Sequence, residues 1–357
     1  MSCVSVLVAV GVVELVTFIA APVTTDIKSY RLARPPAYHN SPYFSAEFIQ
    51  ESFLQPGGWH APPGSTFLLP NDFSGKYFHS RDGVRVTTDQ PDGAQRRILI
   101  FGSSTVYSSE VPDSLTISSL LQRKLNAGGF QRIAVFNYGL SAVTTEQILD
   151  RLRNTELKTN DIIVFYHGAQ DIYQGVLLGR VDNNILDENR RSPLLIKALF
   201  QLAKYSYFAQ YLYLRMEENF SYAHLQDSAA VDRAAEATAV RVRKNVEAAA
   251  KYTQQRGGRF LDALEPTIFT LAHHGEAEEN LARRGGKQWR ALAIAFTAGY
   301  PKLRDAFAGV DFPHEDWSSA FDDIGIPIHL DFCHVTERGN EAIAVKIMNA
   351  LTSRGYL

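Results

Sequence analysis

The chain contains very little cysteine: Cys3 and Cys333 are the two cysteines among 357 residues. Cys3 lies in an apolar run at the N-terminus, so a disulfide framework is not expected. No C-x-x-C pair and no Cys/His cluster with zinc-ligand spacing occurs. We therefore expect no structural metal site, and we interpret Cys333 as a packed thiol.

The sequence also lacks an excess of either charge. It has 36 Lys and Arg against 38 Asp and Glu, a net charge of −2, whereas nucleic-acid-binding proteins are usually clearly basic. Gly (24) and Pro (15) follow no G-X-Y period, which excludes collagen-like chains. Hydrophobic residues make up 45% of the chain, enough for a large core. The composition indicates a folded protein and predicts no nucleic-acid partner.

One long apolar run is present, at the N-terminus. Residues 4–23 have the length of a bilayer-spanning helix, although Glu14 lies near the middle. No Lys or Arg precedes the run, unlike most secretory signals. We interpret residues 1–25 as a membrane anchor or uncleaved signal; a buried core helix is the alternative. We expect an extracytoplasmic main domain, although basic residues after the run favour the opposite side.

The remaining chain divides into two parts. Residues 26–94 are rich in Pro, Gly, Tyr and Phe and predict an extended connector that packs on the main domain. Residues 95–357 alternate short apolar runs with helical patterns. The predicted strands are 97–102, 133–139, 161–168 and 259–264, with a short extended piece at 326–330, and the predicted helices are 111–128, 144–155, 227–255, 288–309 and 335–353.

These alternating elements predict an α/β fold. Strands that are apolar on both faces indicate a mostly parallel sheet covered by helices on both sides, a three-layer α/β/α sandwich. We expect helical insertions around residues 190–325, in which the polar stretch 273–287 is interpreted as an exposed insertion.

Polar residues follow three of the strands and precede the last helix. Ser103-Ser104, Asn137-Tyr138-Gly139 and Gly168-Ala169-Gln170-Asp171 come after strands, and Asp331-Phe332-Cys333-His334 comes before the closing helix. In a parallel α/β sheet, sites collect beyond the carboxyl ends of the strands. A serine nucleophile needs a base, and that base needs a partner to hold its tautomer. Ser104, His334 and Asp331 are the candidates for these three roles.

An oxyanion also requires N–H donors aimed at it. The backbone N–H groups of Ser104 and Gly139 and the side-chain amide of Gln170 are the candidate donors.

The four blocks FGSST, NYG, HGAQD and DFCH stand in this order along roughly residues 95–357. This arrangement resembles the SGNH (GDSL-type) hydrolase family, with its Gly-Asp-Ser, Gly, Gly-x-Asn-Asp and Asp-x-x-His blocks. The resemblance implies a flavodoxin-like sheet, a catalytic triad of Ser104, His334 and Asp331, and an oxyanion hole formed by Ser104, Gly139 and Gln170.

Two positions depart from the family pattern. Ser103 replaces the family's Asp, which creates two adjacent serines and leaves Ser103 as an alternative nucleophile. Gln170 replaces the family's Asn and moves the amide by one methylene, and a misplacement of about an ångström can cost on the order of 10²-fold in rate. The α/β-hydrolase pattern G-x-S-x-G is absent, because the second Gly is missing from residues 102–106.

The resemblance implies a membrane-anchored serine esterase that acts on an acyl ester, for example an acetyl ester, of a glycan, lipid or small molecule. No metal or organic cofactor is expected. One alternative is an O-acyltransferase that uses the same triad with a sugar hydroxyl as acceptor. The other is a catalytically lapsed polysaccharide-binding or assembly protein, which Ser103 and Gln170 would explain.

Overall fold

The computed structural model describes residues 36–54, 57–180 and 222–357, with isolated positions elsewhere (12–14, 16, 198, 202, 206, 208, 209 and 212). The predicted N-terminal helix lies almost wholly outside the described residues, as does the first part of the predicted insertion. No helix within the described ranges has the length and apolar character needed to cross a membrane.

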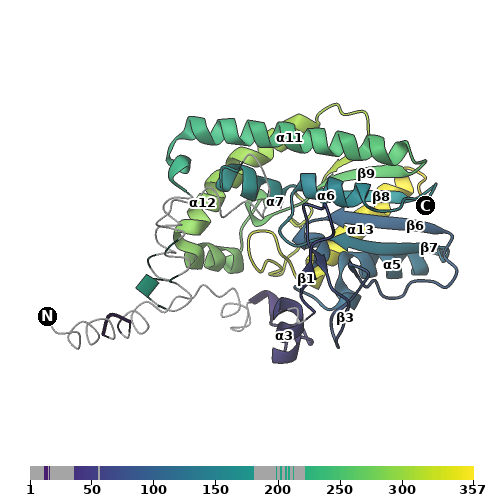
Figure 1. The fold of residues 1–357 in the computed structure, drawn as a ribbon, viewed down its shortest axis with the longest axis horizontal. Coiled ribbons are helices and arrows are strands. Elements are labelled where there is room, and N and C mark those ends of the chain that lie inside the picture. The colour runs from purple at the N-terminus through teal and green to yellow at the C-terminus, as the bar shows by residue number, and fades with distance from the viewer. Residues whose placement is uncertain are drawn as a thin grey trace.

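A mostly parallel sheet forms the centre of the molecule (Figure 1). Its order in the described part of the chain is β10-β9-β8-β6-β7-β5-β4-β3. The strands are β3 (Phe73–Ser74), β4 (His79–Arg81), β5 (Val84–Arg85), β6 (Arg96–Gly102), β7 (Ile133–Gly139), β8 (Ile162–His167), β9 (Arg259–Leu264) and β10 (His314–Asp316).

Strands β6 to β10 pair in parallel. Counted in chain order they stand 2-1-3-4-5, the flavodoxin-like order, whose topological switch point lies between the first and third strands. These two strands are β6 and β8, so the fold directs a crevice to the residues that follow Gly102 and His167. The predicted sheet class is confirmed.

Helices cover both faces of this sheet, because alternate strand residues pack in opposite directions. Leu99 and Phe101 of β6 share a core with helices α6 (Thr145–Arg153), α11 (Ser228–Gln254) and α12 (Glu276–Phe307). Ile98 and Ile100 pack on the other side with α5 (Ile117–Ala127) and α13 (Glu337–Ser353). The arrangement is the predicted three-layer sandwich.

The segment before β6 contributes strands to the same sheet. β5 pairs antiparallel with β7, β4 pairs antiparallel with β5, and β3 pairs antiparallel with β4 at the edge. A separate hairpin pairs β1 (Trp59–His60) with β2 (Leu69–Pro70). Helix α3 (Ala46–Leu54) packs Phe48 and Ile49 in a cluster with Val111 and Leu330. The expected connector is therefore built into the fold next to the loop that begins at Asp331.

Short helical pieces complete the described chain. They are η1 (Pro36–Tyr38), α4 (Ser104–Tyr107), η2 (Asp113–Leu115), α7 (Ala169–Ile172), η3 (Tyr173–Leu177), η5 (Ala223–Gln226) and η6 (Ile268–Thr270). One residue separates α4 from β6 and α7 from β8, so both short helices begin at the switch point of the sheet.

Residues 273–287, expected as an exposed insertion, are mostly exposed or half-buried, but most of them are helical. From Glu276 onward they form the first part of α12, which continues to Phe307 across a kink at Gly286, where φ is 51°. The acidic first turn suits a helix N-terminus, and the Glu278 carboxylate accepts a hydrogen bond from the N–H of Gly275 at 3.1 Å. Leu281 is buried, so the polar segment still has an apolar side that anchors it.

Candidate active site

The turn after β6 places Ser104 at the first position of α4. Gly102 permits this turn: a Cβ there would lie 2.3 Å from Val106 Cγ2 and 2.6 Å from the carbonyl oxygen of Tyr166. Ser103 is the residue before the helix and has extended backbone angles. As the first helical residue, Ser104 has a backbone N–H without an acceptor in its own helix.

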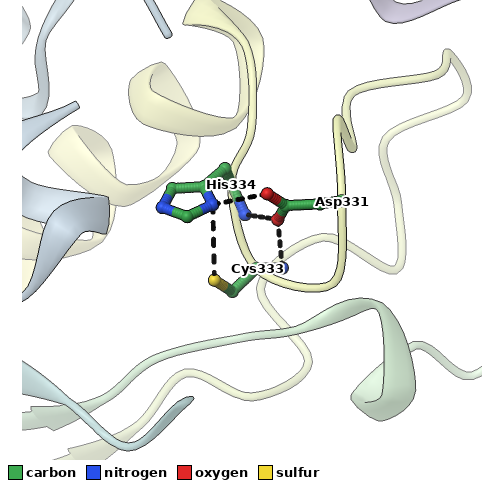
Figure 2. A group of neighbouring side chains, drawn as sticks. All are labelled: Asp331, Cys333 and His334. Carbon is green, nitrogen blue, oxygen red and sulfur yellow. Dashed lines mark hydrogen bonds and ion pairs between the residues drawn. The ribbon is translucent and has the colours of Figure 1, made fainter. Parts of the chain in front are cut away.

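The structure brings Ser104, His334 and Asp331 together. Nε2 of His334 lies 2.7 Å from Oγ of Ser104, and Nδ1 lies 2.7 Å from Oδ2 of Asp331. The other Asp331 oxygen, Oδ1, accepts the backbone N–H groups of His334 at 2.8 Å and Cys333 at 3.0 Å. Figure 2 shows the Asp331 carboxylate held by the loop that carries the imidazole. The arrangement can take a proton from the hydroxyl and support the imidazolium that forms.

The surroundings of His334 favour its charged form. Burial alone would lower its pKa, but the nearby Asp331 carboxylate, which is also its hydrogen-bond partner, raises the pKa well above 6.5. The His334 side chain is 15% exposed and that of Asp331 33%, so their interaction is only partly screened by water. A base of raised pKa accepts a proton readily, but it must first be neutral.

The geometry distinguishes the two adjacent serines. Ser103 is 2% exposed, and its Oγ lies 3.3 Å from Oγ1 of Thr105. Ser104 is half-buried, and its Oγ contacts the imidazole. The arrangement therefore favours Ser104 as the nucleophile, as the block alignment implies.

The oxyanion side differs from the expectation at Gly139. Its backbone N–H donates to Oδ1 of Asn137 at 3.0 Å, so in this structure the N–H already has an acceptor. A Cβ at Gly139 would lie 2.2 Å from the backbone N of Tyr107. The glycine is therefore explained by the close packing of β7 on α4, which Asn137 strengthens by donating from Nδ2 to the carbonyl of Val106 at 2.8 Å.

Gln170 lies in α7, immediately beyond β8, and is half-buried. Its side-chain amide has no hydrogen-bond partner among the described residues. The amide is thus free to donate. The neighbouring Asp171 has a structural role, because its Oδ1 accepts both the N–H and the hydroxyl of Thr145.

A buried carboxyl group that sequence reasoning did not single out connects the two turns of the site. Glu265 follows β9 and is fully buried. Its Oε2 accepts from Oγ1 of Thr105 at 2.6 Å, and its Oε1 accepts from the N–H of Ala169 at 2.7 Å. Burial raises the pKa of Glu265. One side chain thereby fixes the residue after Ser104 and the residue before Gln170. In the sequence, Glu265 could have been found as an acidic residue directly after the predicted strand 259–264.

Arg85 is the second residue that sequence reasoning missed. This fully buried side chain on β5 donates from Nε to Asp113 at 2.9 Å and from Nη1 to the Tyr107 carbonyl at 2.6 Å. It also donates to the carbonyls of Ser108 and Val111. Arg85 thus holds the end of α4, and no local sequence pattern identifies it, since its partners lie more than twenty residues away.

Two hollows among the described residues bear on the site. A small cavity of about 10 Å³ is lined by Thr105, Glu110, Cys333 and His334, among others. A larger one, about 510 Å³, is lined mainly by segments 273–280 and 321–329, and none of the three residues of the Ser104 constellation lines it. Phe321 lines both hollows. The larger hollow is therefore not the place where Ser104, His334 and Asp331 meet.

No protein-family model matches the chain, and no curated protein matches it. Among solved structures, the chain is similar to a member of the lipolytic G-D-S-L family from Veillonella parvula, with 15% identity, a TM-score of 0.42 and coverage of 72% of this chain and 98% of that one. It is also similar to a lipase/acylhydrolase from Enterococcus faecalis, with 16% identity, a TM-score of 0.37 and coverage of 73% and 97%.

The aryl esterase of M. smegmatis is a further similar structure, with 13% identity, a TM-score of 0.39 and coverage of 73% of this chain and 100% of that one. These three similar structures are therefore a lipolytic G-D-S-L family member, a lipase/acylhydrolase and an aryl esterase. Because identity and TM-score are low, we infer the function of this chain from the geometry of its own site.

Proposed function

We propose that the protein is a serine ester hydrolase with Ser104 as nucleophile, His334 as general base and acid, and Asp331 as the residue that orients His334. The observation that carries this proposal is the continuous chain from Asp331 Oδ2 through the imidazole to Ser104 Oγ, with a separation of 2.7 Å at each contact. Such a chain is the arrangement that activates a hydroxyl for attack on a carbonyl.

In the first half of the reaction, Ser104 Oγ forms a bond to the ester carbonyl carbon while its proton passes to Nε2 of His334. The imidazolium is stabilised by Asp331 through Nδ1–H. The tetrahedral intermediate collapses as the C–O bond to the alcohol breaks, and Nε2 returns the proton to the departing oxygen. The product at this stage is an acyl ester of Ser104.

In the second half, water attacks the acyl carbonyl and gives a proton to the same Nε2. Collapse of this intermediate releases the carboxylic acid and restores the Ser104 hydroxyl. Both intermediates carry a negative oxygen, which requires N–H donors. We assign the backbone N–H of Ser104 and the side-chain amide of Gln170 as donors. The N–H of Gly139 could join them only if Asn137 released it.

The acyl group and the alcohol are proposed at the level of class. The family resemblance favours a short acyl ester, such as acetyl, on a glycan, lipid or small molecule.

The proposal is tested by hydrolysis of p-nitrophenyl acetate and p-nitrophenyl octanoate by the full chain in detergent. We expect turnover of the acetate by the wild type and by Ser103→Ala, and none above background by Ser104→Ala. Equal rates in the wild type and Ser104→Ala would overturn it. A well-folded wild type that is inactive on a panel of acyl esters would favour the binding-protein alternative.

A further inference from the structure

A cysteine thiol lies beside the imidazole of the proposed base (Figure 2). Sγ of Cys333 is 3.7 Å from Nδ1 of His334, and Oδ2 of Asp331 is 2.7 Å from the same nitrogen. The three potential ligand atoms all lie within 4.8 Å of one another. Cys333 is packed in the core, as expected, and it takes no part in the proton path from Ser104 to Asp331.

The separation of these atoms fits a zinc ion. With Zn–S near 2.3 Å and Zn–N near 2.0 Å, two ligands of a tetrahedral zinc lie roughly 3.5 Å apart. The Sγ–Nδ1 distance is already close to that value. The Asp331 oxygen would have to move back by roughly half an ångström to become a ligand. Its side chain is 33% exposed, and its other oxygen, Oδ1, is held by the N–H groups of Cys333 and His334.

We propose that Asp331, Cys333 and His334 form an inhibitory binding site for Zn²⁺. Thiolate, imidazole and carboxylate together are a typical zinc ligand set, and water can take the fourth position. The small cavity lined by Cys333 and His334 lies next to the ligand atoms. The site overlaps the proposed triad, so zinc and the hydrogen bond between Nδ1 of His334 and Asp331 exclude each other.

Zinc binding changes the protonation of both residues. The thiol proton of Cys333 goes to solvent and a Zn–S bond forms, with no change of oxidation state. The imidazole keeps one proton, which must lie on Nε2 because Nδ1 ligates the metal. Nε2 then donates to Ser104 Oγ and cannot accept the serine proton. Zinc thereby removes the base without displacing the serine.

Metal binding is measured directly, so that its outcome does not depend on the proposed hydrolysis. Co²⁺ is added to the full chain in a Cys3→Ser background, which leaves Cys333 as the only thiol. We expect one equivalent of Co²⁺ to give a near-ultraviolet absorption band from thiolate-to-cobalt charge transfer. Added Zn²⁺ should displace the cobalt and abolish this band. Zinc affinity is then measured by competition with a chromophoric chelator.

Cys333→Ala should lose the cobalt band and bind zinc at least about 100-fold more weakly, because loss of a direct ligand should exceed the roughly 10–100-fold effect of losing an outer partner. His273→Ala, in the larger hollow, is the matched control and should leave zinc affinity unchanged. A wild type without the thiolate band, or equal zinc affinity in Cys333→Ala, would overturn the proposal.

The inhibitory effect rests on the proposed function and is tested separately. Zinc should abolish hydrolysis of p-nitrophenyl acetate by the wild type, EDTA should restore it, and Cys333→Ala should need at least about tenfold more zinc. Zinc binding through Cys333 without any esterase activity would refute the hydrolase and leave the metal site standing. Equal sensitivity of the wild type and Cys333→Ala to zinc would refute the inhibitory role.

Discussion

The two sides of Ser104 are organised differently. On the proton-transfer side, Asp331 and His334 form direct contacts of 2.7 Å up to the serine hydroxyl. On the oxyanion side, the Gly139 N–H is already bonded to Asn137, and the Gln170 amide makes no hydrogen bond among the described residues. Preorganised donors account for much of the rate of acyl-transfer enzymes. For the proposed hydrolase, the comparison indicates a base that is ready before substrate binds and an oxyanion hole that is less completely formed.

The support of the two sides also differs. Asp331 is fixed by backbone N–H groups of its own loop, at Cys333 and His334. The turn that carries Gln170 is connected to the turn that carries Ser104 through the buried side chain of Glu265. The first arrangement is local in sequence, and the second depends on a residue about 95 positions away. Substitutions can therefore alter the proton-transfer side and the oxyanion side independently.

The largest effect is expected at the serine itself. Ser104→Ala should lower kcat for p-nitrophenyl acetate by about 10⁴-fold or more, as removal of a triad nucleophile does. Ser103→Ala is the matched control, and its kcat should stay within about tenfold of the wild type, because its hydroxyl contacts Thr105 and not His334. A larger loss in Ser103→Ala than in Ser104→Ala would reverse the assignment.

Asp331→Asn tests the proton-transfer side next. We expect kcat to fall by roughly 10⁴-fold, because the amide no longer enforces the tautomer or supports the imidazolium. The pH profile gives a second readout. Hydrolysis needs neutral His334, whose pKa is raised above 6.5 mainly by Asp331 against the lowering effect of burial.

Wild-type activity should therefore be lost as the pH falls through a midpoint above 6.5, and the residual activity of Asp331→Asn should show a lower midpoint. An unshifted midpoint in the variant would show that Asp331 does not control the His334 pKa.

Gln170 tests the oxyanion side. Removing one oxyanion donor costs about 10²–10³-fold in kcat, so Gln170→Ala should fall in this range with KM little changed. Gln170→Glu is the informative control, since it keeps the size of the side chain and loses its N–H donors. If Gln170→Glu retains wild-type kcat, the amide is not a donor and the oxyanion hole must be formed by other groups.

The smallest expected effect is that of Glu265→Gln, which keeps the shape but replaces one acceptor oxygen by an N–H₂ donor. We expect kcat to fall by about tenfold with KM unchanged, as misplacement of positioned groups does. The double variant with Thr105→Val should show a coupled effect, because the two side chains share one hydrogen bond. Additive effects, or a change only in thermal stability, would limit Glu265 to a structural role.

The sequence predicted the parts of the molecule that depend on local pattern. The ranges of β7 and β9 agree with the expected strands, and the Asp-x-x-His spacing correctly placed Asp331 beside His334. Both rest on short-range features: apolar runs between turns, and a side chain that reaches the backbone of its own loop.

Features that depend on tertiary packing were missed. For Gly139, the close contact with Tyr107 that explains its missing side chain was not foreseen, nor was the hydrogen bond of its N–H to Asn137, and its role as an oxyanion donor stays a prediction. The segment 273–287 was interpreted as an exposed insertion, and the helix that most of it forms was missed because its charges hide the buried Leu281. Arg85 and Glu265 act on residues far away in the sequence, so neither spacing nor periodicity reveals them.

The central claim is that His334 activates Ser104 in the folded protein. The most direct measurement is covalent labelling of the full chain by a fluorophosphonate, followed by intact mass and peptide mapping, in the wild type, Ser103→Ala, Ser104→Ala and His334→Ala. The account predicts one adduct on Ser104 in the wild type and in Ser103→Ala, and none in Ser104→Ala or His334→Ala. A folded wild type that remains unlabelled, or an adduct on Ser103, would contradict it.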